Sequence, residues 1–304
     1  MAQPKMVSPM RLPSTRELHA FLITAEHLNF TAAAKHLNVT QGAVSRQIQT
    51  LEEQLRVRLF QRHARGLTLT PKGLEFLPLV QQVLTQLQKA VDQVSNEKQQ
   101  IKLKAPSCIT AWLLPKLMSF QQAHPEIDVE LTSAIMHSVS FASEPFDAAI
   151  CYAEQPPQKD TKAFRLFDEY LSPMCSPSLF GRESLPVELD ALHKYTWLHA
   201  TPQHSDWKLW LEHIGYQGQV AVQNQRFATL DLAVSAAIQG FGIAVGDVTL
   251  AQQDLNAGRL ILPYPQRVPS GKCYYLVRPN TAPNPSLTLL FDWILSDVSQ
   301  QALT

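Results

Sequence analysis

Cysteine is scarce in the sequence, and the few cysteines are far apart. The 304 residues contain four of them, at Cys108, Cys151, Cys175 and Cys273. None forms a CxxC pair, so the sequence predicts no zinc framework, no disulfide framework and no metal site. Scattered free thiols are typical of proteins in reducing compartments, and we therefore expect a cytoplasmic protein.

Long hydrophobic runs are missing as well. The most apolar window, at about 230–248, is interrupted by Asp231, Gln239, three glycines and Asp247, so no membrane span is expected. The first residues, MAQPKMVSPMRLP, have no apolar stretch, which argues against a secretory signal. A chain of 304 residues exceeds what one hydrophobic core usually supports, and two or three domains are expected.

Motifs of enzymatic sites are also absent. The sequence holds no GxSxG, HExxH, P-loop or GxGxxG pattern. The glycine-rich stretch that starts at Gly240 follows a predicted helix and begins a predicted strand, the reverse of a phosphate-binding loop, so Gly240 is better interpreted as a helix C-cap. The ten histidines are dispersed. The sequence therefore predicts no catalytic residue, no enzyme activity and no cofactor.

Charge is distributed unevenly, although the whole chain has a formal net charge of zero. Residues 1–73 carry ten Lys and Arg against four Glu and no Asp, a net of +6, so the remainder carries −6. A basic N-terminal quarter attached to an acidic remainder indicates a module that binds a polyanion. A merely solvated surface is the alternative that charge alone leaves open.

Apolar residues at helical spacing predict three helices in this basic quarter. The first starts at Ser14, whose side chain and Glu17 fit a capping box. The second covers Thr31–Leu37, and the third follows the N-cap candidate Thr40 and ends near Leu55. The alternating segment RVRLFQRHARGLTLT then predicts a short β-hairpin that turns at Arg65-Gly66.

Two short helices joined by a three-residue break are typical of a helix-turn-helix, whose second helix enters the DNA major groove. The third predicted helix would then present to bases Gln41, Gly42, Ser45, Arg46 and Gln49. Gln pairs with adenine and Arg with guanine, and helix N-termini accept phosphates. The predicted contacts to phosphates or the minor groove are Thr31, Thr40, Arg62 and Arg65. A surface helix that faces only water is the alternative.

A long helix is predicted from Pro71, a favoured first position for proline, to about Gln100. Its apolar residues alternate in steps of three and four, as in a heptad seam, at Leu77, Val80, Leu84, Leu87, Val91 and Val94. We expect this seam to pair two chains, with packing against the helix's own domain as the alternative. Pro78 should kink the helix near its start.

From Ile101 onward, short strands and helices alternate to the end of the chain. This pattern predicts α/β sheets with helices on their faces, and about 200 residues of it suggest two α/β subdomains.

The stretch NFTAAAKHLNVTQGAVSRQIQTLEEQLRVRLFQRHARGLTLTPKG resembles the winged helix-turn-helix of LysR-type transcriptional regulators. With RLPSTRELHAFLITAEHLNFT, it resembles the subgroup of the glycine-cleavage activator and the β-lactamase regulators. A looser likeness, in LLPKLMSFQQAHPEIDVEL and AVSAAIQGFGIAVGDVTLAQQDLNAGRL, extends over essentially the whole chain.

The resemblance implies a multi-domain protein with three parts. These are a winged helix-turn-helix DNA-binding domain (1–70), a dimerising linker helix (71–100) and a periplasmic-binding-protein-like effector domain (101–304). The effector domain would comprise subdomain I (101–168 and 268–304) and subdomain II (169–267), with crossovers near Phe167–Leu171 and Leu262–Val268. It also implies a homotetramer that binds promoter DNA, RNA polymerase and a small-molecule effector.

The resemblance places the effector in the cleft between the subdomains, where hydroxyls and helix N-termini lie. The predicted contacts are Ser107, Thr110, Thr132, Ser133, Tyr152 and Thr229, with Tyr274 as a weaker candidate. An ordinary cap or turn residue is the alternative for each. Because no arginine lies near Thr132, a neutral or zwitterionic effector is favoured over a strongly anionic one. The competing function is a solute-binding module whose helical N-terminus only oligomerises, with no role on DNA.

Overall fold

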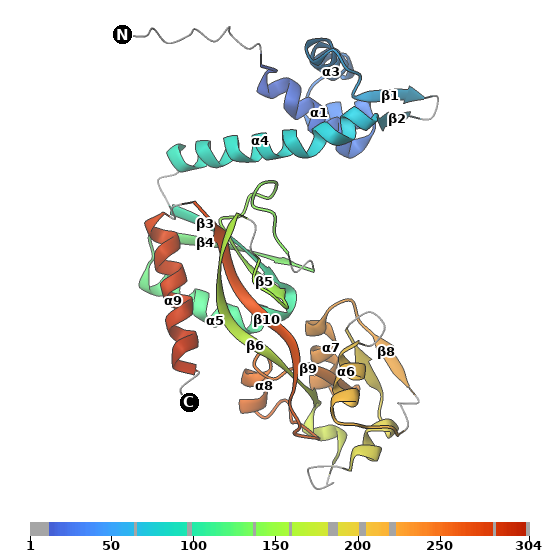
Figure 1. Cartoon of the computed structure of the whole chain (residues 1–304), viewed down its shortest axis with the longest axis vertical. Coiled ribbons are helices and arrows are strands. Elements are labelled where there is room, and N and C mark those ends of the chain that lie inside the picture. Colours follow the sequence, from blue (N-terminus) through green and yellow to red (C-terminus); the bar gives the residue numbers. More distant parts are fainter. Residues whose placement is uncertain are drawn as a thin grey trace. The chain divides into compact units, whose positions relative to one another are not determined.

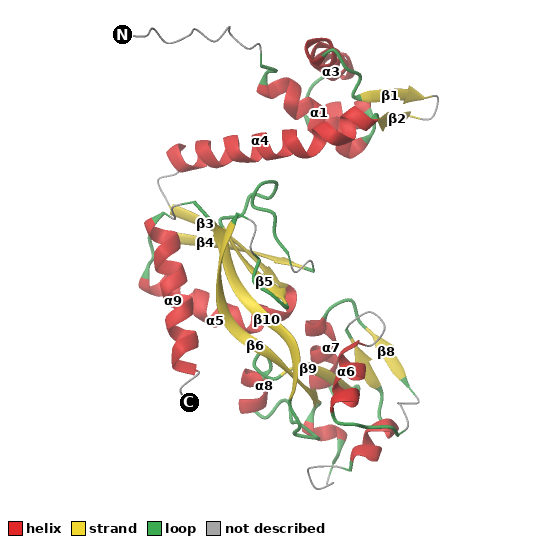
Figure 2. Cartoon of the chain, viewed as in Figure 1, coloured by secondary structure: helices red, strands yellow, loops and turns green. Residues whose placement is uncertain are grey.

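The chain, in a computed structural model, forms two compact units (Figure 1). The first extends to Asn96, and the second holds nearly all of the chain from Glu97. The structure describes residues 12–63, 66–95, 99–135, 138–157, 160–181, 188–200, 205–218, 223–281 and 284–301. Figure 2 shows helices and one hairpin in the first unit, and mixed helices and strands in the second. No helix in these ranges is long and apolar enough to cross a membrane.

Three helices form the body of the first unit: α1 (Thr15–His27), α2 (Phe30–His36) and α3 (Gln41–Leu55). The predicted capping box is present, since the Ser14 backbone N–H donates to Glu17 Oε2 at 2.7 Å and the Glu17 N–H donates to Ser14 Oγ at 3.3 Å. Thr40 caps α3 by accepting the N–H of Ala43 at 3.2 Å. The helices bury a common core around Phe21, Val44, Ile48 and Leu51.

The start of α2 differs from the prediction by one residue. Asn29 is the N-cap, and its Oδ1 accepts the N–H groups of Thr31 at 2.8 Å and Ala32 at 3.2 Å. Thr31 therefore lies inside the first turn rather than at its beginning. An Asn side chain reaches these N–H groups as well as a Thr side chain does, and apolar periodicity does not separate the two positions.

The predicted hairpin is present as β1 (Phe60–His63) and β2 (Gly66–Leu69), paired antiparallel. Glu52, which is only 8% exposed, holds this hairpin to α3. Its Oε1 accepts the N–H groups of Leu59 at 2.8 Å and Phe60 at 3.1 Å, and its Oε2 accepts Arg58 Nη1 at 2.9 Å. The hairpin is thus fixed to the third helix by a buried carboxylate. Arg65 lies outside the described residues.

Helix α4 (Pro71–Ser95) is capped by Thr70, whose Oγ1 accepts the N–H of Gly73 at 3.0 Å. Gly73 packs against the backbone just before β1. A Cβ at this position would lie 2.3 Å from the carbonyl oxygen of Leu59. Pro78 lies inside α4, which continues past it. The predicted end near Gln100 is wrong, because strand β3 already begins at Gln99.

The first half of the predicted dimer seam is corrected by the structure. Val80 is 2% exposed in the core of its own unit, and Leu77 and Leu84 pack half-buried against the same core. The exposed apolar residues form a stripe with steps of four, here called the α4 stripe: Leu79, Val83, Leu87 and Val91. The heptad pattern did not separate these two faces, because both are apolar. The side chain of Val94 lies outside the described part.

One eight-stranded sheet runs through the second unit, in the order β4-β3-β5-β10-β6-β9-β7-β8. Its strands are β3 (Gln99–Pro106), β4 (Ile127–Ala134), β5 (Ala148–Ala153), β6 (Thr161–Met174), β7 (Trp197–His199), β8 (Asn224–Arg226), β9 (Ile243–Asp247) and β10 (Val268–Pro279). Its helices are α5 (Thr110–Ala123), α6 (Ser205–His213), α7 (Leu230–Ile238), α8 (Gln252–Asn256) and α9 (Pro285–Gln301). The predicted alternation of strands and helices is therefore present.

The long strands β6 and β10 join the two halves of this sheet. They pair antiparallel along their length, and the register is interrupted between Pro269 and Cys273. Helices α5 and α9 cover one face of the first half, whose core includes Leu113, Phe120 and Leu290. In the second half, α6 and α7 cover opposite faces of β7 and β9. The result is two α/β subdomains, as predicted.

Replacing Glu52 with alanine removes the acceptor of two buried backbone N–H groups. Since an unsatisfied buried donor costs about 1–3 kcal/mol, we expect the unfolding free energy of the first unit to fall by about 2–3 kcal/mol. The five tryptophans all lie beyond residue 96, so amide hydrogen exchange of peptides from α3 and β1 is the suitable measurement. Glu53→Ala, at the exposed neighbouring position, should change the unfolding free energy of the first unit by less than about 0.5 kcal/mol. Equal protection in both variants would contradict this role of Glu52.

Candidate nucleic-acid interface and effector cleft

The outward face of α3 carries the polar residues predicted to read bases. Gln41, Gly42, Arg46 and Gln49 are exposed, and Ser45 is half-buried. The opposite face is the core face of Val44, Ile48 and Leu51. One helix therefore separates a packed side from a side that is free to meet a ligand, and Gly42 has open space where a side chain would be.

The hairpin places a second cation beside this face. Arg62 Nη2 donates to Ser45 Oγ at 3.2 Å, and its guanidinium lies 5.1 Å from the centre of the Phe30 ring. Arg62 thus bridges α2, α3 and the hairpin. Thr31 and Thr40 are exposed at the N-terminal ends of α2 and α3, where N–H groups favour anions. Exposed amide, guanidinium and N–H donors together suit a phosphate-lined groove.

In the second unit, Ser107 and Asp231 join the two subdomains. Ser107 Oγ donates to Asp231 Oδ1 at 2.7 Å, from the carboxyl end of β3 to the first turn of α7. Beside this bond lies a small cavity of about 130 Å³, here called the cleft cavity. It is lined by Cys108, Ala111, Leu230, Asp231, Val234, Ser235, Ile238, Asp247, Leu250, Ala251 and Asp254.

Two predicted effector residues, Thr110 and Thr229, each precede a residue that lines this cavity, but neither lines it. Thr110 Oγ1 and Thr229 Oγ1 are buried and have no hydrogen-bond partner among the described residues. Thr229 occupies the N-cap position of α7, yet its side chain makes no capping hydrogen bond. The alternative of an ordinary cap therefore does not hold for the Thr229 hydroxyl, because it accepts no N–H group of α7.

The remaining predicted residues lie further from the cleft cavity. Tyr152 donates its hydroxyl to Glu169 and packs 4.9 Å from the Tyr274 ring, measured between ring centres. Lys272 Nζ lies 5.1 Å from the centre of the Tyr152 ring. Thr132 and Ser133 lie on β4, next to Lys104 and Ala105 of β3, and neither lines the cavity. Of the predicted effector residues, Ser107 thus bonds to a residue of the cavity wall, and none of the six lines the cavity itself.

Sequence reasoning missed two buried carboxyl groups near the crossover strands. Asp247 ends β9, and burial raises its pKa to about 7, with a smaller contribution from the charge of Glu169. Burial also raises the pKa of Glu169, although hydrogen bonds from Ser270 and Tyr152 oppose the increase. The only sequence signal was an aspartate directly after the apolar strand GIAVG. Desolvation of the half-buried Cys108 raises the pKa of its thiol to about 11, so the thiol stays protonated.

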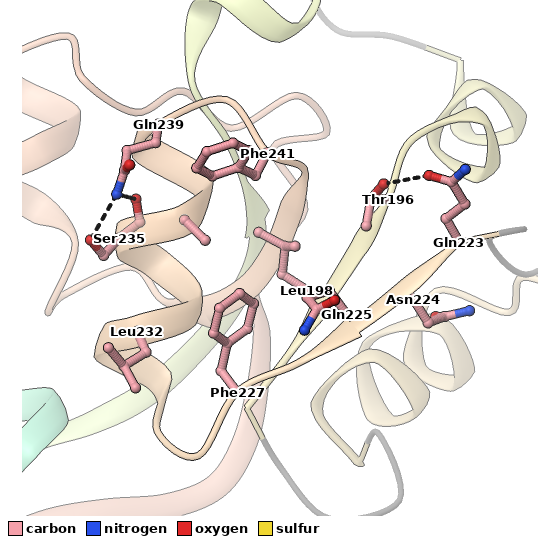
Figure 3. Close-up of a pocket in the computed structure, with 11 residues that line it drawn as sticks. Thr196, Leu198, Gln223, Asn224, Gln225, Phe227, Leu232, Ser235, Gln239 and Phe241 are labelled. Carbon is pink, nitrogen blue, oxygen red and sulfur yellow. Dashed lines mark hydrogen bonds between the residues drawn. The ribbon is translucent and has the colours of Figure 1, made fainter.

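A second, larger hollow of about 730 Å³ lies on the other face of α7, between α7 and strands β7 and β8 (Figure 3). Leu198 and Phe227 lie toward its centre, and Phe241 and Leu232 are exposed at its rim. Gln239 Nε2 donates to the backbone oxygen of Ser235 at 3.3 Å along its wall. Residues of helix α7 therefore line both hollows.

Comparison with known proteins identifies the family. Residues 15–74 match the bacterial regulatory helix-turn-helix protein family of the lysR type, and residues 95–299 match the LysR substrate binding domain. The chain belongs to the LysR family. It is 32% identical over 295 residues to the glycine cleavage system transcriptional activator of Escherichia coli K12, covering 96% of each chain. It is 31% identical to the transcriptional activator AmpR of Pseudomonas aeruginosa PAO1, covering 94% of this chain and 96% of that one.

The fold agrees with this family. The crystal structure of ArgP from Mycobacterium tuberculosis matches 95% of this chain and 98% of its own, with a TM-score of 0.62 and 18% identity. That likeness concerns the fold alone. As a LysR-type regulator, the chain combines a DNA-binding helix-turn-helix with an effector-binding domain of two α/β subdomains. The predicted family, subgroup and fold class are confirmed, and LysR proteins are regulators rather than enzymes.

The raised pKa of Asp247 predicts a pH-dependent effect of Asp247→Asn. The folded state holds the Asp247 proton up to about pH 7, against an ordinary value of 3.8, so wild-type stability falls as pH rises from about 4 to 7. Asparagine does not titrate. We therefore expect the unfolding free energy of Asp247→Asn, relative to that of the wild type, to increase by on the order of 1–3 kcal/mol from pH 5 to pH 8.

Urea unfolding followed by tryptophan fluorescence measures this effect, because every tryptophan lies in the second unit. The matched control is Asp128→Asn, an exposed carboxylate on β4, which should give the same small change at both pH values. A pH-independent effect of Asp247→Asn would contradict the raised pKa.

Proposed function

We propose that this LysR-type regulator recognises promoter DNA through the outward face of α3. Gln41, Ser45, Arg46 and Gln49 read bases, while Thr31, Thr40, Arg62 and Arg65 contact phosphates or the minor groove. The observation that carries the proposal is the exposed polar face of α3, set against its buried core face and next to Arg62. The +6 charge of residues 1–73 supplies the attraction to the DNA backbone.

The DNA-binding domain is assigned to residues 1–70, the linker helix to α4 (Pro71–Ser95) and the effector domain to the chain from β3, which begins at Gln99. Two chains pair through the α4 stripe, whose apolar residues face solvent in the single chain. Two such dimers form a homotetramer in the cytoplasm. A pair of recognition helices held by one dimer contacts two half-sites of the promoter.

A small-molecule effector binds in the cleft between the two subdomains and changes how the protein regulates transcription by RNA polymerase. The support is a cavity bounded by both subdomains, with Cys108 and Ala111 on one side and Leu230 and Asp231 on the other. The Ser107–Asp231 hydrogen bond joins the subdomains directly. A ligand that binds one arrangement of the subdomains more tightly than another shifts their populations, and DNA affinity changes with them.

Arg46→Ala tests base reading by α3. Loss of a bidentate contact to guanine should weaken binding to a DNA site selected from random sequence by about 1–3 kcal/mol and relax the preference at one base position. Fluorescence anisotropy with the selected site and each single-base variant measures both effects. Arg267→Ala, which removes an exposed arginine from the effector domain, serves as the control. Equal weakening on selected and random DNA would exclude base reading by Arg46.

Leu87→Asp tests pairing through the α4 stripe. Leu87 is 43% exposed in the single chain, so a charge there costs little until a second chain covers it. We expect the particle mass from light scattering to fall by half. Gln86→Asp places the same charge on the neighbouring exposed position and should leave the mass unchanged. An unaltered mass for Leu87→Asp would remove the α4 stripe from the interface.

A further inference from the structure

Glu52 and Glu53 are adjacent in the sequence and have different environments near the end of α3. Glu52 is buried, and it accepts hydrogen bonds from backbone N–H groups of the hairpin and from Arg58 Nη1. Glu53 is exposed, and its Oε1 accepts Gln49 Nε2 at 3.1 Å. The carboxylate of Glu53 therefore contacts a residue of the exposed face of α3 rather than the core.

Glu53 continues a row of side chains along this face. Gln41, Ser45, Gln49 and Glu53 follow one another in steps of four within α3, and residues at this spacing are neighbours on one side of a helix. Gln49 and Glu53 also line the same hollow of about 250 Å³ at the end of α3. A base that contacts Gln49 therefore meets an amide whose neighbour along the helix is a carboxylate.

The hydrogen bond with Glu53 fixes the orientation of the Gln49 amide. A carboxylate only accepts hydrogen bonds, so the amide turns its nitrogen toward Glu53 and its oxygen away. The amide nitrogen has two hydrogens, and Glu53 uses one of them. The other hydrogen and the amide oxygen remain for a ligand. Gln49 thus presents one donor and one acceptor side by side.

This donor and acceptor match the edge that adenine exposes in the major groove. Adenine offers N7 as an acceptor and its N6 amino group as a donor. The free N–H of Gln49 can donate to N7 while the amide oxygen accepts from N6. Guanine offers two acceptors, N7 and O6, so the Gln49 oxygen would face O6 with no hydrogen between them. To give guanine a second donor, Gln49 would have to break its hydrogen bond with Glu53.

We propose that Glu53 is a positioning residue that makes Gln49 select adenine over guanine. Its carboxylate holds the Gln49 amide, before DNA binds, in the orientation that pairs with adenine. This inference rests on the proposed base reading by α3 and names the base that Gln49 selects. The negative charge of Glu53 repels the phosphates of every sequence alike, so it lowers overall affinity without distinguishing between bases.

Binding of the full chain to single-base variants of a DNA site selected from random sequence tests the proposal. Fluorescence anisotropy with Gln49→Ala first locates the base pair whose preference depends on Gln49, where the wild type should prefer adenine. In Glu53→Ala, the preference for adenine over guanine at this base pair should fall by a factor of about three to ten, because binding to guanine no longer breaks a hydrogen bond. The preference at the base pair read by Arg46 should stay the same.

Glu53→Gln is the matched control for the charge. Both variants lose one negative charge, so both should bind random DNA more tightly than the wild type and to the same extent. The side-chain oxygen of glutamine can still accept the Gln49 N–H. Glu53→Gln should therefore keep the adenine preference that Glu53→Ala loses. Amide hydrogen exchange of α3 peptides should be similar in the wild type and both variants, which shows that the change arises at the DNA.

An unchanged adenine preference in Glu53→Ala would overturn the role of Glu53 and leave Gln49 as a base reader. Loss of the preference in Glu53→Gln as well would also overturn it, because the charge rather than the hydrogen bond would then be responsible. A wild-type preference for a base other than adenine would have the same consequence. If Gln49→Ala changed no base preference, the proposed base reading by Gln49 would be wrong, and the inference with it.

Discussion

The carboxylate of Glu52 is the interaction on which the arrangement of the DNA-binding unit depends. It lies in the last turns of α3 and accepts the backbone N–H groups of Leu59 and Phe60, where the chain enters the hairpin. Because those groups are buried, the hairpin cannot shift along α3 without leaving them unsatisfied. The hairpin in turn places Arg62 against Ser45. The spacing between the exposed face of α3 and the wing is therefore set from inside the core.

In the effector domain, polar contacts likewise join two parts of the structure, here the two subdomains. The strands β6 and β10 pass through both subdomains, and the cleft cavity lies between the first turn of α5 and the helix α7. Ser107 and Asp231 join the subdomains here with one hydrogen bond, and the buried Asp247 lies in the wall of the same cavity. The subdomains thus meet through polar contacts that a ligand can replace or complete. A purely apolar contact would offer no such choice between ligands.

Local signals in the sequence predicted much of the fold. The capping box at Ser14 and Glu17 and the cap at Thr40 depend on residues three apart, and both are present. The core face of α3 followed from helical spacing and is also correct. Predictions that depended on distant residues were weaker. The face of α4 that Val80 buries is decided by the helices packed against it, so the heptad pattern pointed to the wrong side for half its length.

The effector cleft shows the same limit. Ser107, Thr110 and Thr229 were predicted because hydroxyls at strand ends and helix starts are recognisable in the sequence, and Ser107 bonds to Asp231 of the cavity wall. Asp247 was missed because its burial results from the crossing of β6 beside β9, where Leu171 pairs with Asp247. No pattern within a short window predicts that contact. Glu169 was missed for the same reason, since its partners Tyr152 and Ser270 are far away in the chain.

The salt dependence of DNA affinity tests the central claim, that the first unit binds the DNA backbone with its basic face, most directly. A dimer that places Arg62 and Arg65 of each chain near phosphates should release about one counterion for each charge contact. The logarithm of the association constant for a selected site should then fall with the logarithm of salt concentration, with a slope of roughly −4. A slope near zero would contradict the account.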